Sequence, residues 1–383
     1  MNKEEKNLKI RQSIQDTRKR HQTMDCKTYE IKVLHAKLNK DQKTTINTMF
    51  REAKWLRNFH IANNIDKTFR STRTVQIKVQ DHFEKRRISS LGSQMIQDVF
   101  DNIKSELKGL KTKKDKSGKG GKLSLRSVCN SISLRQYGTT FAVKDEHHVR
   151  IQNIKKPLYV KGLKQIPKGA EISNAKLVRR VIGLYIYITC FIPKEEIVKQ
   201  NKMVGIDFGV AHNLNLSDGR VIDIKLLDDK MIIIYSKRLN RSFIKNGKVR
   251  SKNHFRRASL LQKAYRKQNN RKYDRANKVL HDLNKSYDLI AIQDEMIANW
   301  HKGLFGKQVQ QSCMGMIKAK LKANPKVIVI PRSFPSTQIC PKCGATTKHP
   351  LSKRTYDCPH CGYHHPSRDI KSAQSILDYA LTM

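Results

Sequence analysis

The 383-residue sequence predicts a multidomain α+β protein, with an antiparallel β domain that carries a helical insertion and then an α/β domain. Three observations indicate this order. Between residues 123 and 192, apolar residues recur with a period of two and are separated by turn signals. After residue 203, short apolar runs alternate with long helical patterns, as expected for an α/β domain. Two Cys-x2-Cys pairs then interrupt this pattern near the end of the chain.

We expect the β domain to span residues 28–200, built from residues 28–38 and 123–200. Apolar side chains alternate along residues 29–33, which predicts one strand, and the first of the later strands is expected at residues 123–125. Several short strands at such regular spacing are typical of a small antiparallel barrel or sandwich.

Residues 39–122 form the predicted helical insertion, a recognition module on this interpretation. Asn39 followed by Gln42 is a capping-box pattern that predicts a helix to about residue 64. Apolar residues four apart over residues 91–107 predict a second helix that packs on the first. Residues 111–122 are so rich in Lys and Gly that we expect a flexible loop, either contacting a nucleic-acid backbone or only solvated.

Alternatives stay open for two N-terminal features. Residues 1–27 are polar and basic on every helical face, which predicts an arm that is disordered or is ordered by RNA, with a plain solvated tail as the alternative. Trp55 and Phe59 lie on the first predicted helix, where aromatic residues belong to the core more often than to a base-stacking surface.

The charge of the chain indicates a polyanionic partner. Lys and Arg number 78 against 32 Asp and Glu, a formal net charge of +46. Such an excess favours phosphate contacts whose affinity falls with salt. No run of 18 apolar residues and no signal peptide pattern is found, so a membrane partner is not expected. Basic ribosomal and chromatin proteins could also explain the charge, but they are usually far shorter than 383 residues.

Basic residues are especially dense over residues 256–285, where the pattern is helical. Ala276, Leu280 and Leu283 form an apolar side that we expect to dock on a sheet, while the opposite face follows a phosphate backbone.

The cysteine pattern predicts a structural zinc site in a reducing, cytoplasmic environment. Four of the eight cysteines form two Cys-x2-Cys pairs fourteen residues apart, within a ribbon expected over residues 334–366. Four thiolates in this arrangement suit a closed Zn2+ tetrahedron. The predicted ligands are Cys340, Cys343, Cys358 and Cys361. Gly344 and Gly362 fit the tight turn that follows each pair.

Three acids lie at the ends of separate elements of the α/β domain, expected over residues 201–383. Asp207 sits in a buried strand between Gly205 and Gly209, which would leave room for a ligand. Glu295 follows the strand of residues 289–292, at the tip where α/β sheets bind ligands.

The third acid is Asp369, which could also be the N-cap of the last helix. Asp294, next to Glu295, is not counted among the three, because alternation along the strand directs its side chain to the opposite face. Carboxylates suit Mg2+, and two such ions would promote phosphodiester hydrolysis. The sequence contains no P-loop, no Ser/His/Asp hydrolase order and no dinucleotide fingerprint.

On these motifs the chain resembles the RuvC-like nucleases of the TnpB family, which transposons encode, and the miniature type V CRISPR effectors, of V-F-like type. The resemblance is most specific over residues 203–377: residues 205–209 look like the family's first acid motif, 290–295 its second, 336–362 its ribbon and 368–370 its third. It implies an RNase H-like (RuvC) domain with an inserted zinc ribbon, preceded by a wedge-like β barrel with the helical insertion.

The resemblance also implies a structured guide RNA, a double-stranded target DNA and cutting of both strands in one acid site. Many family members have Glu-Asp-Leu at the second motif, where a simple alignment places Gln293 in the position of the glutamate. We assign the ligand role to Glu295, two residues later on the same face. If Gln293 held the ligand position, metal affinity would fall and the protein could bind without cutting.

The resulting hypothesis is a Mg2+-dependent, RNA-guided DNA endonuclease. The alternative is a nuclease-inactive, RNA-guided repressor. A tyrosine transposase fits poorly, because the His-His pairs at residues 147–148 and 364–365 lack its His-x-His pattern. The sequence does not distinguish transposon from CRISPR context, or a monomer from an RNA-bound homodimer.

Overall fold

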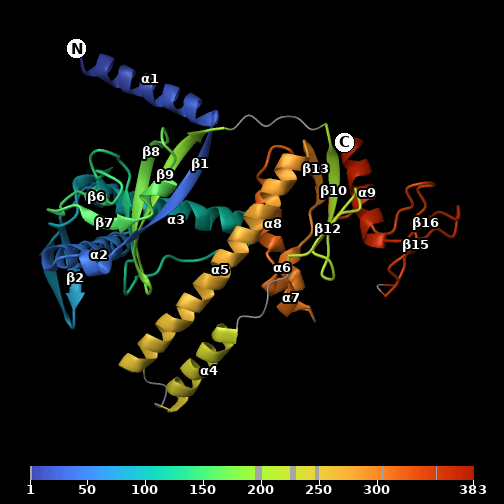
Figure 1. The fold of residues 1–383 in the computed structure, drawn as a ribbon. Helices are drawn as coiled ribbons and strands as arrows, with labels where there is room; N and C mark the ends of the chain where they lie inside the picture. Colours follow the sequence, from blue (N-terminus) through green and yellow to red (C-terminus); the bar gives the residue numbers. More distant parts are fainter. Residues whose placement is uncertain are drawn as a thin grey trace. The chain divides into compact units, whose positions relative to one another are not determined.

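The chain forms two compact units, Met1–Glu195 and Glu196–Met383, in a computed structural model (Figure 1). The structure describes residues 2–118, 120–194, 201–224, 230–245, 250–303, 305–350 and 352–383. Most of the charged linker expected at residues 193–202 therefore lies outside the described residues. No helix within these ranges has both the length and the apolar character needed to cross a bilayer.

A seven-stranded antiparallel sheet organises the first unit, in the order β4-β8-β9-β1-β7-β6-β5. The strands are β1 (Met24–Val33), β4 (Ser131–Leu134), β5 (Phe141–Val143), β6 (His148–Ile151), β7 (Leu158–Lys161), β8 (Glu171–Arg180) and β9 (Gly183–Pro193). Ile31, Val33 and Ile186 are among the buried residues of its core, which confirms the period-two prediction. β4 and β5 are the two edge strands, so the sheet is not closed. It forms a near-barrel around this core. Residues 123–125, predicted as a strand, are irregular.

The helical insertion contains two long helices and a hairpin. They are α2 (Lys40–Ala62), α3 (Ser93–Ser117), β2 (Thr74–Val79) and β3 (His82–Arg87), and short 3-10 turns occur at His35–Lys37, Lys67–Phe69 and Leu163–Gln165. The capping box is confirmed, because the Asn39 side chain accepts from the Gln42 amide at 2.8 Å and Gln42 Oε1 accepts from the Asn39 amide at 3.0 Å. Trp55 and Phe59 pack against the core, as the core interpretation predicted.

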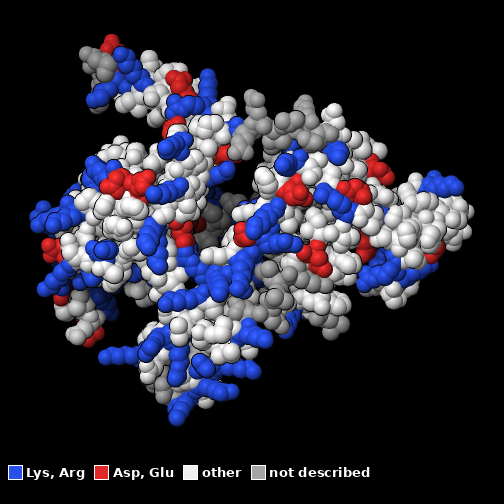
Figure 2. Space-filling model, viewed as in Figure 1, with Lys and Arg blue, Asp and Glu red and all other residues white. Residues whose placement is uncertain are grey.

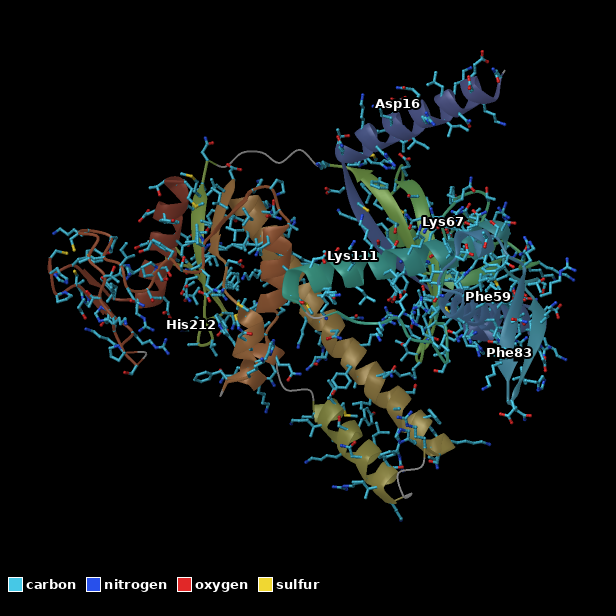
Figure 3. All side chains as sticks on the ribbon, turned by 180° about the vertical axis from the view of Figure 1, so that it is seen from behind. Asp16, Phe59, Lys67, Phe83, Lys111 and His212 are labelled. Carbon is cyan, nitrogen blue, oxygen red and sulfur yellow. The ribbon has the colours of Figure 1, made fainter. Side chains whose placement is uncertain are left out.

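Three features of this unit differ from the prediction. The segment of residues 111–117, predicted as a flexible loop, continues α3 past Lys111 (Figure 3), and Gly118 ends the helix with a left-handed φ of +66°. The β2–β3 hairpin was not predicted; it carries Phe83, whose side chain is 69 % exposed.

The basic N-terminal arm is the third. It is a helix, α1 (Lys3–Gln22), in place of a disordered arm, and an Asn2–Glu5 capping box begins it. Basic residues in its last turn offset the helix dipole.

The second unit is built on a five-stranded mixed sheet in the order β12-β11-β10-β13-β14. Its strands are β10 (Met203–Phe208), β11 (Leu214–Leu216), β12 (Val221–Ile222), β13 (Leu289–Gln293) and β14 (Val327–Ile330). β10 pairs antiparallel with β11 but parallel with β13, and β13 pairs parallel with β14. The strand order therefore reverses between β10 and β13, which creates a topological switch point at their carboxyl ends.

Helices cover both faces of this sheet (Figure 1). The helices of the unit are α4 (Lys230–Lys245), α5 (Lys252–Ser286), α6 (Ile297–Trp300), α7 (Gly306–Gln311), α8 (Met314–Lys322) and α9 (Arg368–Leu381). Ala276, Leu280 and Leu283 of α5 are buried with residues of α8 and the sheet, which confirms the predicted apolar side of the basic helix. Ile376 and Ala380 of α9 are buried against Ala291 and Ile330 on the other face.

Details of the predicted helices need correction. The sequence over residues 307–321 predicts one helix, but the structure has two, α7 and α8, with a break at Ser312–Cys313. Helix α4 was not predicted. Lys272 lies within the basic segment of residues 256–285 but is buried, and its Nζ donates to the Gln310 carbonyl. The N-cap of α9 is Ser367 instead of Asp369, since the Ser367 hydroxyl accepts from the Ile370 amide at 3.3 Å.

Candidate metal-binding active site

The four ribbon cysteines converge as predicted. Cys340 Sγ lies 3.6 Å from Cys361 Sγ, and Cys343 Sγ lies 3.7 Å from Cys358 Sγ. All four sulfur atoms lie within 4.8 Å of one another. A zinc ion bound at about 2.3 Å from each sulfur requires sulfur atoms about 3.8 Å apart, so the thiolates fit a tetrahedral Zn2+.

The ribbon achieves this geometry with little other structure. Its one small sheet joins β15 (Tyr356–Asp357) to β16 (His364–His365). Gly344 and Gly362 have φ values of +73° and +67°, and their amides donate to the carbonyls of Cys340 and Cys358, so both predicted turns are confirmed. Although burial opposes ionisation of Cys340, the amides of Cys343 and Lys342 lower its pKa, which favours the ligating thiolate.

The three predicted acids line one cavity of about 450 Å3 in the second unit. Asp207 reaches it from β10, Glu295 from the segment after β13, and Asp369 from the first turn of α9. β10 and β13 are parallel neighbours, so their carboxyl ends meet at the switch point of the sheet. The fold thus brings together residues that are far apart in the sequence.

The electrostatics of Asp207 reflect its burial first and the neighbouring negative charges second. Burial of this half-buried residue and the charges of Asp369 and Glu295 raise its pKa to about 8, while a hydrogen bond from Ser372 and the charge of Arg368 oppose the shift. Burial also raises the pKa of Glu295. Such a group of oxygen ligands has the charge and chemistry that suit Mg2+.

The carboxylates are spread more widely than the thiolates. Across the described part of the chain, the ribbon cysteines form the only group of three or more such side chains with ligand atoms all within 4.8 Å. Ligands of one Mg2+ at about 2.1 Å lie at most about 4.2 Å apart. The three acids as they stand therefore do not all surround one ion.

The neighbouring residues distinguish Glu295 from the other candidates of the second motif. Asp294 forms ion pairs with Lys318 at 2.9 Å and Lys322 at 2.8 Å, whose hydrogen bonds lower its pKa to about 2. It does not line the cavity. Gln293 is buried, and its amide Nε2 donates to the carbonyls of Pro331, Arg332 and Phe334.

These hydrogen bonds from the Gln293 amide group make Gln293 unsuited to bind a metal ion. A carboxylate at this position could not donate to the three carbonyls, so the amide is matched to its structural contacts. Glu295 is then the acid of this segment that is directed at the cavity.

Helix α9 delivers the third acid. The Asp369 carboxylate lies 3.7 Å from Arg354 Nη1 and 3.9 Å from Arg368 Nε. It occupies the first turn, where the helix dipole favours negative charge.

Gly205 allows this approach of α9. A Cβ at Gly205 would lie 2.0 Å from the Ala373 carbonyl oxygen, so α9 backbone occupies the space that the sequence had suggested for a ligand. At Gly209 the corresponding position is 2.5 Å from the carbonyl oxygen of His212, in the β10–β11 loop (Figure 3). The expected room for a ligand is therefore wrong at Gly205, whereas Gly209 does line the cavity.

Cationic residues of the cavity were missed in the sequence. Arg332 and Arg354 line it together with Arg368 and Trp300. Arg332 follows β14, which runs parallel to β13, so its place at the shared carboxyl edge could have been inferred from the strand order. A phosphodiester is negatively charged and is repelled by the three carboxylates. Guanidinium groups next to these carboxylates can bind its oxygen atoms and reduce this repulsion.

Basic side chains gather over the α4–α5 hairpin (Figure 2). Exposed positions of α5 include Arg256, Arg257, Lys263, Lys267, Arg271, Arg275 and Lys278. Asp274 pairs with Lys278 at 2.8 Å and offsets little of this charge. The hairpin therefore presents a surface suited to phosphates.

Comparison with known proteins supports the resemblance read from the motifs. Residues 312–376 match the family model described as the Cas12f1-like TNB domain. A curated protein of Streptomyces pristinaespiralis, named "Putative RNA-guided DNA endonuclease", is 24 % identical over 229 residues. The match covers 58 % of this chain and 56 % of the relative, so the chain spans about half the length of that protein.

A solved structure, the cryo-EM structure of a Cas12f1–sgRNA–target DNA complex, superposes on 74 % of this chain and 70 % of its own chain. The TM-score is 0.42 at 16 % identity. The family model and the curated relative confirm that this chain is similar to the TnpB and miniature type V group.

Proposed function

We propose that this protein is an RNA-guided DNA endonuclease that hydrolyses target DNA in a RuvC-like site. The observation that carries the proposal is the shared cavity of Asp207, Glu295 and Asp369. Three acids from separate elements at a switch point are suited to divalent cations, and the similar curated protein is named for the same activity.

The fold of the second unit supports the RNase H-like part of the proposal. Three antiparallel strands, β10 to β12, are extended by the parallel strands β13 and β14, with helices on both faces. The first acid lies on the central strand, and the zinc ribbon lies between β14 and α9.

Each residue of the site has a proposed role. Asp207, Glu295 and Asp369 would hold two Mg2+ ions, which when bound activate a water molecule and stabilise the leaving oxygen. Arg332 and Arg354 would orient the phosphodiester, because both residues line the cavity and guanidinium groups bind phosphate oxygens well. The four cysteines would hold Zn2+ and fix the ribbon.

Guide RNA and double-stranded target DNA are the proposed partners. The formal charge of +46 and the exposed Lys and Arg of α5 provide phosphate contacts, while base pairing would supply sequence specificity. We also predict that one or two copies of the chain bind each RNA and that the protein is cytoplasmic.

The test is cleavage of a matched plasmid by the purified ribonucleoprotein with Mg2+, using a library of randomised flanking sequences. We expect double-strand breaks at the guided site with wild-type protein and none with Asp207→Ala, although both bind the target equally. Binding without linearisation at any flanking sequence would refute the nuclease and favour the guided repressor.

A further inference from the structure

The two ends of helix α9 are held in place by different contacts. The second half packs on the sheet through apolar side chains: Ile376, Leu377, Tyr379 and Ala380. The first turn, which carries Asp369, instead buries two cations, Arg368 at 7 % exposed and Lys371 at 0 %. Buried charged groups are costly unless they are hydrogen-bonded, so the partners of these two side chains decide where the first turn lies.

Arg368 attaches this turn to the zinc ribbon. Its backbone amide donates to the Arg354 carbonyl at 2.7 Å, and its Nη1 donates to the Pro350 carbonyl at 3.0 Å. The amide of the preceding Ser367 donates to Nδ1 of His365 at 3.1 Å. All three acceptors belong to the ribbon of residues 334–366, so the residue directly before Asp369 is fixed to it by backbone and side chain.

Lys371 attaches the same turn to a second part of the ribbon. Its Nζ donates to the Ser336 carbonyl at 3.0 Å and to the Ile339 carbonyl at 2.6 Å. Ile339 directly precedes the first predicted zinc ligand, Cys340. The residues on both sides of Asp369 in the first turn therefore contact the ribbon, through different ribbon segments.

Tyr356 connects Lys371 with the thiolates. Lys371 Nζ lies 4.0 Å from the centre of the Tyr356 ring, which is a cation–π contact. Tyr356 is fully buried in one cluster with Cys340 and Cys358, and its hydroxyl donates to the Gln338 carbonyl at 3.1 Å. A small unit of this kind is folded by its metal, so the place of Tyr356 against Lys371 depends on bound zinc.

We propose that Arg368 and Lys371 are positioning residues that attach the first turn of α9 to the zinc ribbon, so that the ribbon holds the Asp369 carboxylate at the acid cavity. They act on divalent cations through the placement of Asp369. The inference deepens the proposed function and rests on the same acid site. Order in the ribbon becomes a condition for cation binding in the cavity, although the two candidate metal sites share no ligand.

Lys371 has a matched control in the same unit. Lys272 of α5 is also a buried lysine, and its Nζ donates to the Gln310 carbonyl, outside the ribbon. Lys371→Met and Lys272→Met both delete an ammonium group and keep an unbranched side chain. Removing a positive charge near carboxylates by itself favours Mn2+, because less like charge opposes the ion. Weaker Mn2+ binding by Lys371→Met therefore identifies lost positioning.

The first experiment measures Mn2+ binding to the full-length, zinc-loaded protein by electron paramagnetic resonance, without guide RNA or DNA. We expect Lys371→Met to weaken the Mn2+ affinity that depends on Asp369 roughly tenfold, as for other residues that support a ligand from outside, and Lys272→Met to leave it unchanged. Zinc content and the thermal midpoint establish that each variant is folded. Equal or tighter Mn2+ binding by Lys371→Met overturns the proposal, as does a wild-type protein without an Asp369-dependent site.

A second experiment removes zinc instead of a side chain and covers the case in which Lys371→Met does not fold. Hydrogen exchange of the full-length wild-type protein is compared before and after chelation of zinc. We expect exchange to accelerate roughly tenfold over residues 367–371 and to stay unchanged over residues 373–379, which pack on the sheet. Unchanged exchange over residues 367–371 overturns the proposal, as does equal acceleration in both ranges.

The outcomes separate this inference from the proposed function. Both expected results in a protein that does not cleave guided DNA would reject only the proposed nuclease. Efficient cleavage by Lys371→Met with wild-type Mn2+ affinity would reject only the positioning role.

Discussion

The zinc ribbon and the acid cavity are both candidate metal sites, but they are assembled in different ways. The four cysteines fall within residues 340–361, and their sulfur atoms all lie within 4.8 Å of one another. The three acids are drawn from residues 207–369 and share a cavity of about 450 Å3 without approaching so closely.

This difference reflects what holds each site in place. Two tight turns place the thiolates, and metal binding itself supplies the folding energy of such a unit. The acids depend on strand pairing of β10 with β13 and on the packing of α9 across β10. A closed structural site can be local, whereas an open reactive site is positioned by the tertiary fold. Four predictions follow from this contrast, from the largest effect to the smallest.

Loss of a zinc ligand should unfold the ribbon. Cys358→Ser removes a buried thiolate from a site whose metal contributes roughly 10–16 kcal/mol in such units. We expect zinc content to fall and residues 334–366 to become sensitive to protease. Cys26→Ser, at an exposed cysteine outside the ribbon, is the control that should keep its zinc. Full zinc retention by Cys358→Ser would contradict the four-thiolate site.

A methyl group at Gly205 should disrupt the acid cavity without touching an acid. Gly205→Ala places Cβ 2.0 Å from the Ala373 carbonyl oxygen and must push α9 away from β10. Overpacking of this kind costs about 3 kcal/mol, measurable by urea denaturation. Gly315→Ala is the control, because no atom lies within 4 Å of its Cβ position and alanine favours helix α8. A stable Gly205→Ala protein would show that α9 tolerates displacement.

Crowding of the acids should appear in the pH dependence of stability. The pKa of Asp207 is raised to about 8 in the folded protein, so the folded state binds this proton more tightly than the unfolded state. Its contribution to stability is full below the unfolded pKa of about 4 and is lost as pH rises towards 8. Thermal midpoints without added divalent cations should show a steeper loss over this range for wild type than for Asp207→Asn. Identical profiles would mean that neither burial nor the neighbouring acids raise the pKa of Asp207 in the folded protein.

The smallest effect is expected for Asp294, next to the proposed ligand. Its carboxylate is 48 % exposed and pairs with Lys318 and Lys322, so Asp294→Ala should cost less than about 1 kcal/mol. Target cleavage should change by no more than a few-fold, whereas Glu295→Ala should abolish it. The reverse ranking of the two variants in a cleavage assay would move the ligand role to Asp294.

Much of the fold could be predicted where a pattern is local. The period of two identified most strands of the first unit, and the Asn39–Gln42 pair identified the start of α2. Failures occurred where polar composition was taken for disorder, as in α1 and the end of α3. Terminal charges in α1 and helix-favouring lysines at the end of α3 support helix where the sequence shows no apolar stripe.

The candidate ligands could be named from the chain, because Cys-x2-Cys spacing and acids at strand ends are visible in a few adjacent residues. The contacts that decide what each residue does were not readable. Sequence alone placed Gln293 and Glu295 on one strand face, and only the tertiary fold gave the Gln293 amide three carbonyls to bind and directed Glu295 to the cavity. Likewise, Gly205 gave no sign that the α9 backbone would lie against it. Such roles depend on atoms contributed by distant segments, and packing brings those segments together only in the folded chain.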